Sequence, residues 1–384
     1  FRGSWIADYP DAENYLSLFY SKNFCPDGPN YTHFKNTSFD IAYRAGVSQS
    51  TVSRALRNSP LVNEETRLRV QAIAKELNYK VDKNASSLRT QRSGTIALLL
   101  FEDPTNDDSL INPFFMSMLG SITRACGNKG YDLLVSFQQM SHDWHADFED
   151  TRKADGIILL GYGDYTDYEE KLIQLIEQET HFVRWGAEVK ELPVISVGCD
   201  NFQGGYQLTE HVIKNNRKDF AFLGGVTSGS PEFLERYLGH CKAQKDNNLI
   251  VNKNLQFDAI STEEAGHYAA LKLINKGEKF DAIMAASDLI AVGAMRALQE
   301  NGINVPEQVA VFGFDDIPVA SFTFPALTTA RQDTMLAGEL LVEKLLSLIN
   351  GEEAKTELAI TLQLNPAQSD AYANLGHIHF RQKH

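Results

Sequence analysis

Residues 38–56 read SFDIAYRAGVSQSTVSRAL, and this stretch decides the fold of the first part of the chain. Its pattern predicts two short helices joined by a tight turn. Ser38 can cap the first helix, Asp40 suits its positive end, and Gly46 can adopt the left-handed conformation that ends it. Ser48 can then cap the second helix, in which apolar residues recur at helical spacing. The stretch therefore predicts a helix-turn-helix motif.

A third helix is predicted from Asn63 to about Tyr79, with apolar residues at i, i+3, i+4 and i+7 that close a small core. The second helix of the motif has hydrogen-bonding side chains on its opposite face, and such a helix fits the major groove of DNA. We expect Gln49 and Ser50, at its start, to reach base edges, and Arg54 to bind a guanine. The side chains better placed for phosphates are Thr51, Ser53 and Arg57.

The charge of the chain is unevenly distributed. A formal net charge of −14 argues at first against binding to nucleic acid. Between Phe34 and Ser93, however, eleven Lys and Arg stand against five acidic residues, which gives +6 locally and leaves −20 for the remainder. A basic head on an acidic body indicates that the head alone meets DNA. This contrast weighs against the alternative of an ordinary three-helix fragment with a solvated polar face.

Length and composition restrict the remaining classes. A chain of 384 residues predicts two or three folding units. No apolar run approaches the ~20 residues that cross a bilayer, and the first residues lack an export signal, so we expect a cytoplasmic protein. The four cysteines lie far apart, which predicts buried free thiols. We expect neither a metal nor a cofactor.

From Gly94 onward, short apolar runs are separated by helix-length segments. Strands of this kind are buried on both faces and predict parallel sheets covered by helices. Nearly 270 residues exceed one sheet, so we expect two doubly wound subdomains facing a cleft, with ligand at the carboxyl ends of the strands. The predicted strands are 95–100, 131–136, 156–160, 194–197, 220–223, 282–285 and 309–313, with a last one at 358–362.

The chain resembles a known family over roughly residues 36 to 360. The head, at 40–56, 62–67 and 76–79, closely resembles the DNA-binding head of the lactose-repressor (LacI/GalR) family. The resemblance implies an all-α head, a periplasmic-binding-protein-like core, operator DNA and a homodimer. It also implies a small effector, commonly a sugar, sugar phosphate or nucleobase. The matching landmarks in the core are 112–115, 155–159, 286–288, 313–316 and 327–332.

Residues 84–89 resemble the hinge helix of that family, whose leucine wedges into the minor groove. Leu88 is the matching residue, and we assign Asn84 and Ser87 to DNA binding with it. An apolar wedge kinks the duplex at a cost of a few kcal/mol, which added contacts offset. Arg57 departs from the family, which often has a small polar residue at that position.

Four core residues receive an effector role from the resemblance. By position, Phe115 would stack on the effector, Arg236 would bind its hydroxyls, and Asp288 and Asp315 would face the cleft. Their patterns leave alternatives open: a core position for Phe115, a surface ion pair for Arg236 and a helix cap for Asp315. Residues 104–111 also lengthen the loop before Phe115 relative to the family.

Arg184 and Trp185 end another apolar strand and complete the candidate site. A sugar suits this mixture because aromatic faces meet its C–H surface while Arg and Asp make charge-assisted hydrogen bonds to its hydroxyls. We favour a maltose-like or sucrose-like oligosaccharide. Effector binding is expected to set the closure angle of the subdomains and hence the separation of paired hinge helices.

The sequence thus predicts a DNA-binding repressor controlled by an effector. An enzyme on this fold would need a phosphate loop or a nucleophile elbow, and neither motif occurs. A transport-type sugar-binding protein would have an export signal and no basic head, and an interaction scaffold is suggested by the last residues alone. The predicted parts are an unassigned extension (1–36), the helix-turn-helix domain (37–80), a hinge (81–93), the effector core (94–362) and a segment like part of a tetratricopeptide repeat (363–384).

Overall fold

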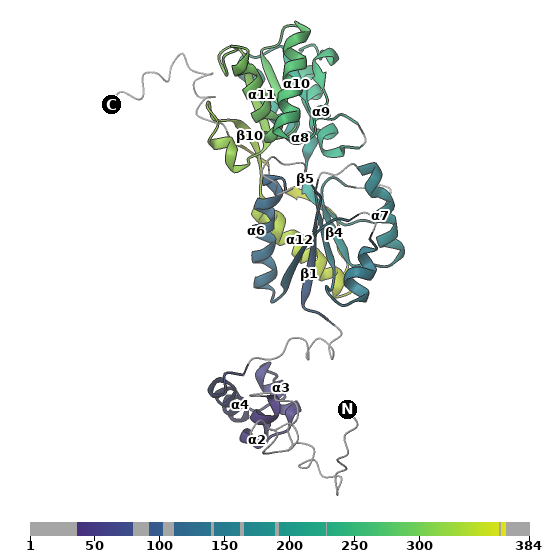
Figure 1. The fold of residues 1–384 in the computed structure, drawn as a ribbon, viewed down its shortest axis with the longest axis vertical. Helices are drawn as coiled ribbons and strands as arrows, with labels where there is room; N and C mark the ends of the chain where they lie inside the picture. The colour runs from purple at the N-terminus through teal and green to yellow at the C-terminus, as the bar shows by residue number, and fades with distance from the viewer. Residues whose placement is uncertain are drawn as a thin grey trace, which may run out of the picture. The chain divides into compact units, whose positions relative to one another are not determined.

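A computed structural model describes residues 37–79, 92–102, 111–139, 142–161, 165–188, 192–227, 229–360 and 362–365. The chain divides into two compact units, Phe1–Gln91 and Arg92–His384 (Figure 1). The predicted hinge residues Asn84, Ser87 and Leu88 lie outside the described residues, as do the N-terminal extension, residues 104–110 and residues 366–384 of the repeat-like segment. Residues 363–365, the start of that segment, belong to a strand, Leu362–Asn365. No helix among the described residues is long and apolar enough to span a membrane.

The first unit contains the three predicted helices: α2 (Ser38–Ala45), α3 (Gln49–Leu56) and α4 (Glu64–Glu76). Their small core is built on buried Ile41, Val52, Ala55 and Val70, whose side chains occupy the predicted apolar stripes. Gly46 ends α2 in the left-handed region, with φ of +65°, as the turn requires. The helix-turn-helix prediction is confirmed.

One predicted cap is wrong. The N-cap of α2 is Thr37 and not Ser38, because the Asp40 carboxylate accepts from the Thr37 backbone N–H at 2.6 Å and from its hydroxyl at 2.7 Å. The helix therefore begins one residue earlier. The other two predicted caps are confirmed: the side chain of Ser48 accepts from the Thr51 N–H, and the side chain of Asn63 accepts from the Thr66 N–H.

The second unit is built on two six-stranded sheets. The first sheet, in the order β11-β5-β4-β3-β1-β2, is parallel throughout. The second, β12-β10-β9-β8-β6-β7, is parallel except that β12 runs antiparallel to β10. The strands are β1 (Thr95–Leu100), β2 (Asp132–Phe137), β3 (Ile157–Leu160), β4 (Phe182–Trp185), β5 (Ser196–Cys199), β6 (Phe220–Leu223), β7 (Gln256–Phe257), β8 (Ala282–Ala285), β9 (Ala310–Asp315), β10 (Thr328–Gln332), β11 (Glu357–Ile360) and β12 (Leu362–Asn365).

Two features of the sheets differ from the predicted strands. The single strand expected at 358–362 is two strands, β11 and β12, which belong to different sheets. The chain changes sheet between them because β11 pairs with β5 and β12 pairs with β10. Strands β7 and β10 were not predicted. The two doubly wound subdomains themselves are confirmed.

Helices cover both sheets. We call the first sheet with its helices the first subdomain and the second sheet with its helices the second subdomain. In the first, α6 packs through Met118 and Ile122 on one face, and α7 packs through Leu172 and Leu175 on the other. Helix α12 follows β10 in the chain but packs on α6 and over β3, β4 and β5 (Figure 1). The helices are α6 (Pro113–Asn128), α7 (Tyr165–Glu177), α8 (Asn201–Lys214), α9 (Pro231–Asp246), α10 (Glu263–Lys276), α11 (Asp288–Glu300) and α12 (Thr334–Ile349).

Helices α8 and α9 approach so closely that only glycine fits between them. A Cβ at Gly239 would lie 2.0 Å from the Phe202 carbonyl oxygen, and one at Gly205 would lie 2.1 Å from the Arg236 carbonyl oxygen. Both distances are to backbone atoms, which cannot swing away as a flexible side chain could. This contact fixes the position of α9 along α8, and with it the position of Arg236 relative to the start of α8.

Candidate DNA-binding surface and effector site

The predicted DNA-contacting residues of the head lie together on α3. Gln49, Ser50, Arg54 and Arg57 are exposed, and Thr51 and Ser53 are partly exposed. Helix α3 therefore presents a continuous row of donors and acceptors to solvent, which is what reading of the major groove requires.

The two arginines of α3 are held differently. The Arg57 guanidinium folds back along the helix, where Nε donates to the Ser53 carbonyl oxygen at 3.1 Å and Nη2 donates to the Ser53 hydroxyl at 3.2 Å. The Arg54 side chain makes no hydrogen bond or ion pair with any part of the chain that the structure describes. Its donors are thus the ones available for a base edge.

Two further contacts of the head were not predicted. Gln49 Nε2 donates to Ser38 Oγ at 2.7 Å, which ties the start of α3 to the start of α2. Arg44 Nη1 lies 2.8 Å from Glu76 Oε1, an ion pair that joins α2 to the end of α4. Sequence spacing gave no signal for the second pair because its members lie 32 residues apart.

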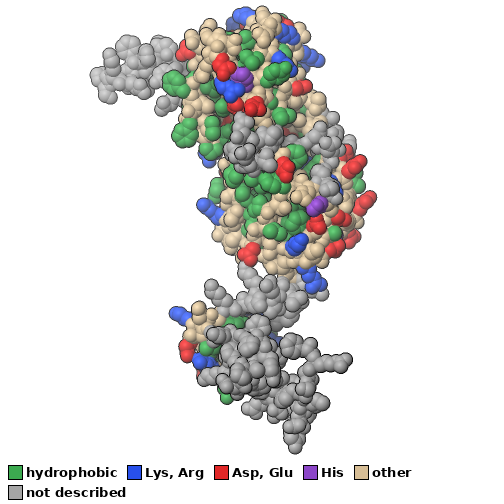
Figure 2. All heavy atoms as spheres, in the orientation of Figure 1, with side chains coloured by type: hydrophobic (Ala, Val, Ile, Leu, Met, Phe, Trp, Pro, Cys, Tyr) green, Lys and Arg blue, Asp and Glu red, His purple; other side chains and the backbone are tan. Residues whose placement is uncertain are grey.

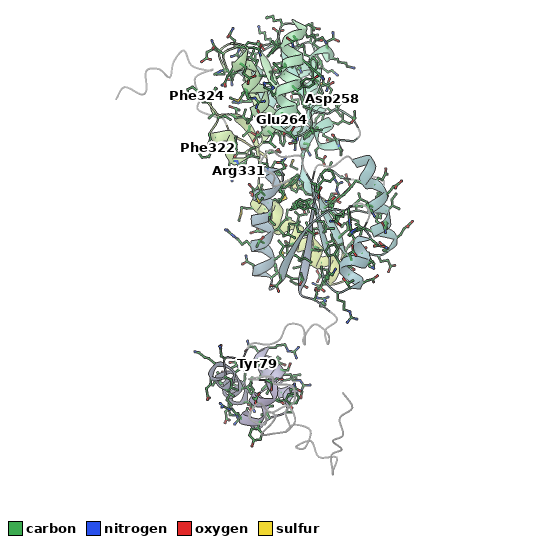
Figure 3. The ribbon with its side chains drawn as sticks, in the orientation of Figure 1. Tyr79, Asp258, Glu264, Phe322, Phe324 and Arg331 are labelled. Atoms are coloured by element: carbon green, nitrogen blue, oxygen red, sulfur yellow. The ribbon has the colours of Figure 1, made fainter. Side chains whose placement is uncertain are left out.

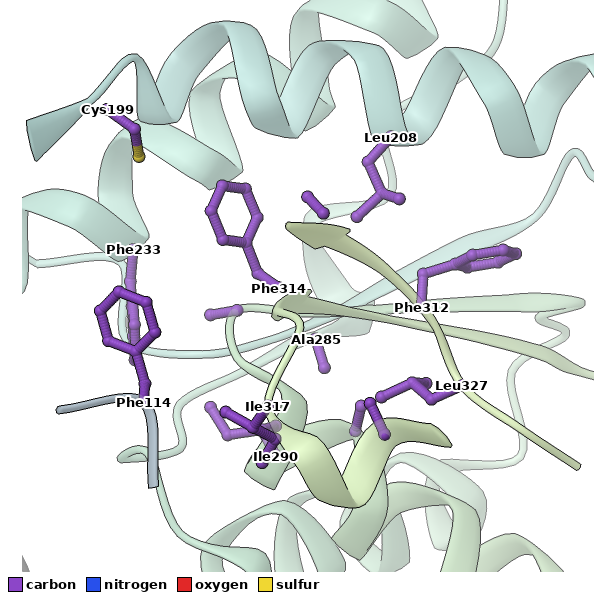
Figure 4. Packing of buried hydrophobic residues seen from close by; sticks show 14 of the residues in the cluster. Phe114, Cys199, Leu208, Phe233, Ala285, Ile290, Phe312, Phe314, Ile317 and Leu327 are labelled. Atoms are coloured by element: carbon purple, nitrogen blue, oxygen red, sulfur yellow. The ribbon is translucent and has the colours of Figure 1, made fainter. Parts of the chain in front are cut away.

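Arg236, on α9, is the centre of a buried polar cluster in the second unit. Its side chain is only 1% exposed. Nε donates to Asn201 Oδ1 at 2.9 Å, Nη1 donates to the Ala286 carbonyl oxygen at 2.5 Å, and the guanidinium lies 3.7 Å from the centre of the Phe314 ring. Nη1 is also 3.6 Å from Asp315 Oδ1. Figure 4 shows Phe314 and Phe233 among the apolar residues at this end of the second sheet.

Asp315 ends β9 and is held from a second side. Gln332 Nε2, at the end of β10, donates to Asp315 Oδ1 at 2.7 Å, and the Cys199 thiol, at the end of β5, donates to Gln332 Oε1 at 3.0 Å. The φ of Asp315 is +114°, a strained value for a residue with a side chain. Such strain clusters at functional sites and persists only where neighbouring contacts enforce it.

Asp288 begins α11 and is fully buried. Its Oδ1 accepts from the Thr329 hydroxyl at 2.6 Å, and its Oδ2 accepts from the Ile317 N–H at 2.9 Å. Burial, followed by the charge of Asp315, raises the pKa of Asp288 well above its ordinary value. The carboxyl thus ties α11 to β10 and to the turn after β9, at the same end of the sheet as Arg236.

Arg184, at the end of β4, reaches across to the other subdomain. Its Nη2 lies 3.7 Å from Glu232 Oε1, and its Nη1 donates to the Ala187 carbonyl oxygen at 3.2 Å. Glu232 belongs to α9 and also accepts from the Ala187 N–H at 2.9 Å. Both charged side chains are buried. Glu232 was not predicted, and only a spatial contact reveals it.

The predicted aromatic residues lie within the core. Phe115 is 1% exposed and meets Phe114 edge to face, with ring centres 5.3 Å apart. Phe114 in turn lies 5.8 Å from Trp185, which is also buried. Of the two phenylalanines, Phe114 is therefore the one next to the end of β4, and stacking of Phe115 on an effector stays a prediction.

A second bridge joins the subdomains beside α6. Asn112, the N-cap of α6, donates through Nδ2 to the Ser261 hydroxyl at 3.1 Å, and Ser261 bonds Ser287 at 2.8 Å. Ser287 is the N-cap of α11, which begins with Asp288. Of the candidate effector residues, the structure thus brings Arg236, Asp288 and Asp315 to one end of the second sheet, with Arg184 linked to it through Glu232.

A separate small cavity, of about 10 Å³, lies between α9 and β6 and has room for one water molecule. It is lined by Tyr237, His240 and Gln244 among others. Burial lowers the pKa of His240 to about 3, so its ring is neutral. The cavity is lined by none of the candidate effector residues. Over the described ranges, no three or more His, Cys, Asp or Glu are arranged to hold a metal ion.

Comparisons with known proteins agree with both units. Residues 39–82 match the model of bacterial regulatory proteins of the lacI family, and residues 209–369 match that of the periplasmic binding protein-like domain. The HTH-type transcriptional regulator RegA of Clostridium saccharobutylicum is 30% identical over 82% of this chain and 92% of its own. The probable HTH-type transcriptional repressor ExuR of Bacillus subtilis is 29% identical over 83% of this chain and 93% of its own.

Solved structures give the same result. A transcriptional regulator CelR–cellobiose complex is 27% identical and superposes with a TM-score of 0.65 over 87% of this chain and 99% of its own. The lac repressor dimer bound to operator and the anti-inducer ONPF, at 24% identity, shares the fold with a TM-score of 0.72 over 88% of this chain and 99% of its own. Head and core together define a DNA-binding regulator with a ligand-binding core. The chain belongs to the lacI family of bacterial regulatory proteins.

Proposed function

We propose that this protein is a cytoplasmic transcriptional repressor, not an enzyme, whose affinity for operator DNA is controlled by a sugar. The observation that carries the proposal is α3, which exposes a row of polar side chains on a compact three-helix head. One of them, Arg54, has no side-chain partner among the residues that the structure describes. The relatives support it, because they are transcriptional regulators and this chain matches them over almost their whole length. We propose that residues 37–80 bind DNA, residues 81–93 form the hinge and residues 94–362 bind the effector.

On DNA, Gln49, Ser50 and Arg54 would read base edges, while Thr51, Ser53 and Arg57 would contact phosphates. Arg57 is exposed, and its guanidinium would leave the Ser53 carbonyl and hydroxyl to contact a phosphate. Following the family resemblance, we propose that Asn84, Ser87 and Leu88 act in the minor groove.

The proposed effector contacts are Phe115, Arg184, Trp185, Arg236, Asp288 and Asp315. Buried arginine and carboxyl groups at strand ends suit sugar hydroxyls, because each charged group makes a strong, oriented hydrogen bond. Cellobiose in the CelR complex supports a sugar of this size. The Arg184–Glu232 and Asn112–Ser261 bridges join the two subdomains, so a ligand that changes their closure would have to break or strengthen these contacts.

The test is selection of duplexes from a random library by the full-length protein at low salt, followed by titration of the selected duplex. We expect a palindromic site, and we expect cellobiose, maltose or sucrose to raise the melting temperature and to change operator affinity between severalfold and about a hundredfold. Retention of no duplex would remove the DNA function. Retention that no sugar affects would remove the proposed effector class.

We propose that the protein acts as a homodimer and that Phe322 and Phe324 lie in its interface. These side chains are 84% and 92% exposed, on the turn between β9 and β10 (Figure 3). The turn is held in shape, since Gln299 Nε2 donates to the Phe324 carbonyl oxygen at 2.7 Å. Figure 2, in the same orientation, shows apolar side chains along this edge. A two-fold axis would bring four such rings together, and each can bury roughly 150–250 Å².

Replacing both phenylalanines, as Phe322→Ser with Phe324→Ser, is expected to shift the protein from dimer to monomer in light scattering coupled to size-exclusion chromatography. Ile250→Ser is the matched control, because Ile250 is 87% exposed elsewhere on the second subdomain and should change nothing. A double variant that stays dimeric at micromolar concentration would place the interface elsewhere.

A further inference from the structure

The second unit begins with three residues that are tied down side by side. Asp155, in the turn before β3, accepts at Oδ1 from the Ser93 N–H at 2.6 Å and from the Ser93 hydroxyl at 2.9 Å. Its Oδ2 accepts from the Gly94 N–H at 2.9 Å. One carboxylate therefore uses both oxygens to fix the backbone directly before β1.

Arg92 ties the same point to the end of a helix. Its Nη2 donates to the Ile349 carbonyl oxygen and its Nη1 to Asn350 Oδ1, both at 2.9 Å. Ile349 is the last residue of α12, and Asn350 is its C-cap. The last carbonyl groups of a helix have no partner within the helix and carry its negative end, so a guanidinium is a favourable partner there.

Helix α12 connects this point to the candidate effector site. Its 16 residues span about 24 Å. It begins at Thr334, two residues after Gln332, which bonds Asp315 and Cys199 where the chain passes between the subdomains. Along its length it is fixed to the first subdomain: Ser121 Oγ donates to the Thr334 carbonyl oxygen at 2.7 Å, and a Cβ at Gly338 would lie 2.3 Å from Ser121 Oγ.

We propose that Arg92 and Asp155 are positioning residues that fasten the chain leaving the first subdomain to α12 and to the first sheet. Movement of the first subdomain against the second then displaces residues 92–94, from which the chain continues toward the DNA-binding part. This inference rests on the proposed function and adds the regulation of that site. Without the anchor, residues 92–94 are no longer held to the first sheet and to α12, and a movement of the first subdomain no longer displaces them by the same amount.

The variants that test the anchor are Arg92→Ala and Asp155→Ala, with Arg92→Lys as the conservative control because an ammonium can still donate to the Ile349 carbonyl. In the full-length protein, we expect amide hydrogen exchange at Gly94 to be slow in the wild type and at least about tenfold faster in Asp155→Ala, since an unpartnered N–H exchanges freely. Equal exchange in the two proteins overturns the anchor, whatever the protein binds.

Operator binding gives the functional readout. Arg92→Ala is expected to weaken affinity for the selected duplex roughly two- to tenfold without any sugar, because a loose segment must be ordered on binding. Its melting temperature should stay that of the wild type, and Arg92→Lys should recover most of the affinity. A purely structural role would instead lower the melting temperature. Unchanged affinity in Arg92→Ala overturns the inference.

The response to cellobiose separates this inference from the proposed function. If cellobiose changes operator affinity in the wild type, the change should be smaller in Arg92→Ala while the affinity for cellobiose itself is kept. An equal response in both proteins overturns the coupling role. If cellobiose affects neither protein, the proposed sugar control by this ligand fails, and the exchange and affinity measurements still decide the anchor.

Discussion

Arg236→Ala is expected to lower the free energy of unfolding of the second unit by about 3–5 kcal/mol, the cost of removing one partner of a buried ion pair. The substitution removes a guanidinium that lies 3.6 Å from the buried Asp315 carboxylate, together with the donors to Asn201 and to the Ala286 carbonyl oxygen. Urea denaturation followed by tryptophan fluorescence measures the loss, since Trp144 and Trp185 both lie in this unit.

Two controls separate charge burial from a general loss of packing. Arg124→Ala removes an exposed arginine of α6 and should change the free energy of unfolding by less than about 0.5 kcal/mol. Arg236→Met combined with Asp315→Asn removes both charges at similar volume and should recover part of the loss. If Arg236→Ala costs no more than Arg124→Ala, the buried cluster does not stabilise the fold in the way its geometry implies.

Arg54→Ala is expected to weaken operator binding by about 1–3 kcal/mol and to relax the preference at one base pair, because the Arg54 guanidinium donates to no other group in the described part of the chain. Titrations against a duplex set with single substitutions measure both effects. Arg57→Ala is the matched control on the same helix. Because Arg57 is assigned to a phosphate, its loss should weaken all duplexes alike and reduce the salt dependence. A uniform loss in Arg54→Ala would contradict base reading.

The fold of the head could be predicted almost completely because its signals are local. Caps, the glycine turn and the apolar stripes all lie within a few residues of the structure they specify. The one error, Ser38 in place of Thr37, arose because either hydroxyl can cap a helix. The N-cap is the residue that lies three positions before an acidic side chain able to accept from its backbone N–H. Asp40 accepts from Thr37 in this way, so Thr37 is the N-cap.

Most core strands could be predicted individually, but β7 and β10 could not, and neither could all of the strand pairings. Residues 358–362 are an apolar run that reads as one strand, and nothing local says that the chain changes sheet within it. The backbone partners that divide it, β5 and β10, lie far away in the sequence. The antiparallel direction of β12 likewise depends on its pairing with β10 and could not be predicted from the local sequence.

The candidate effector residues show the same limit. Family resemblance pointed to Arg236, Asp288 and Asp315, and the structure gathers them at one end of the second sheet. Gln332, the partner of Asp315, and Glu232, the partner of Arg184, could not be predicted, because each comes from a segment with no local sign of a charged neighbour. Phe115 lies beside Phe114, and helical geometry alone does not say which of two adjacent rings faces the end of β4.

The placement of α12 and β11 bears on how the protein is made. The first sheet draws its last strand, and the helix under three of its strands, from residues 334–360, whereas its other strands lie between 95 and 199. During synthesis on the ribosome, the early strands therefore lack α12 and β11 and keep an apolar face uncovered until every strand of the second sheet except β12 has been synthesised. A nascent chain stalled near residue 332 would be a substrate for chaperones, and not a smaller working core.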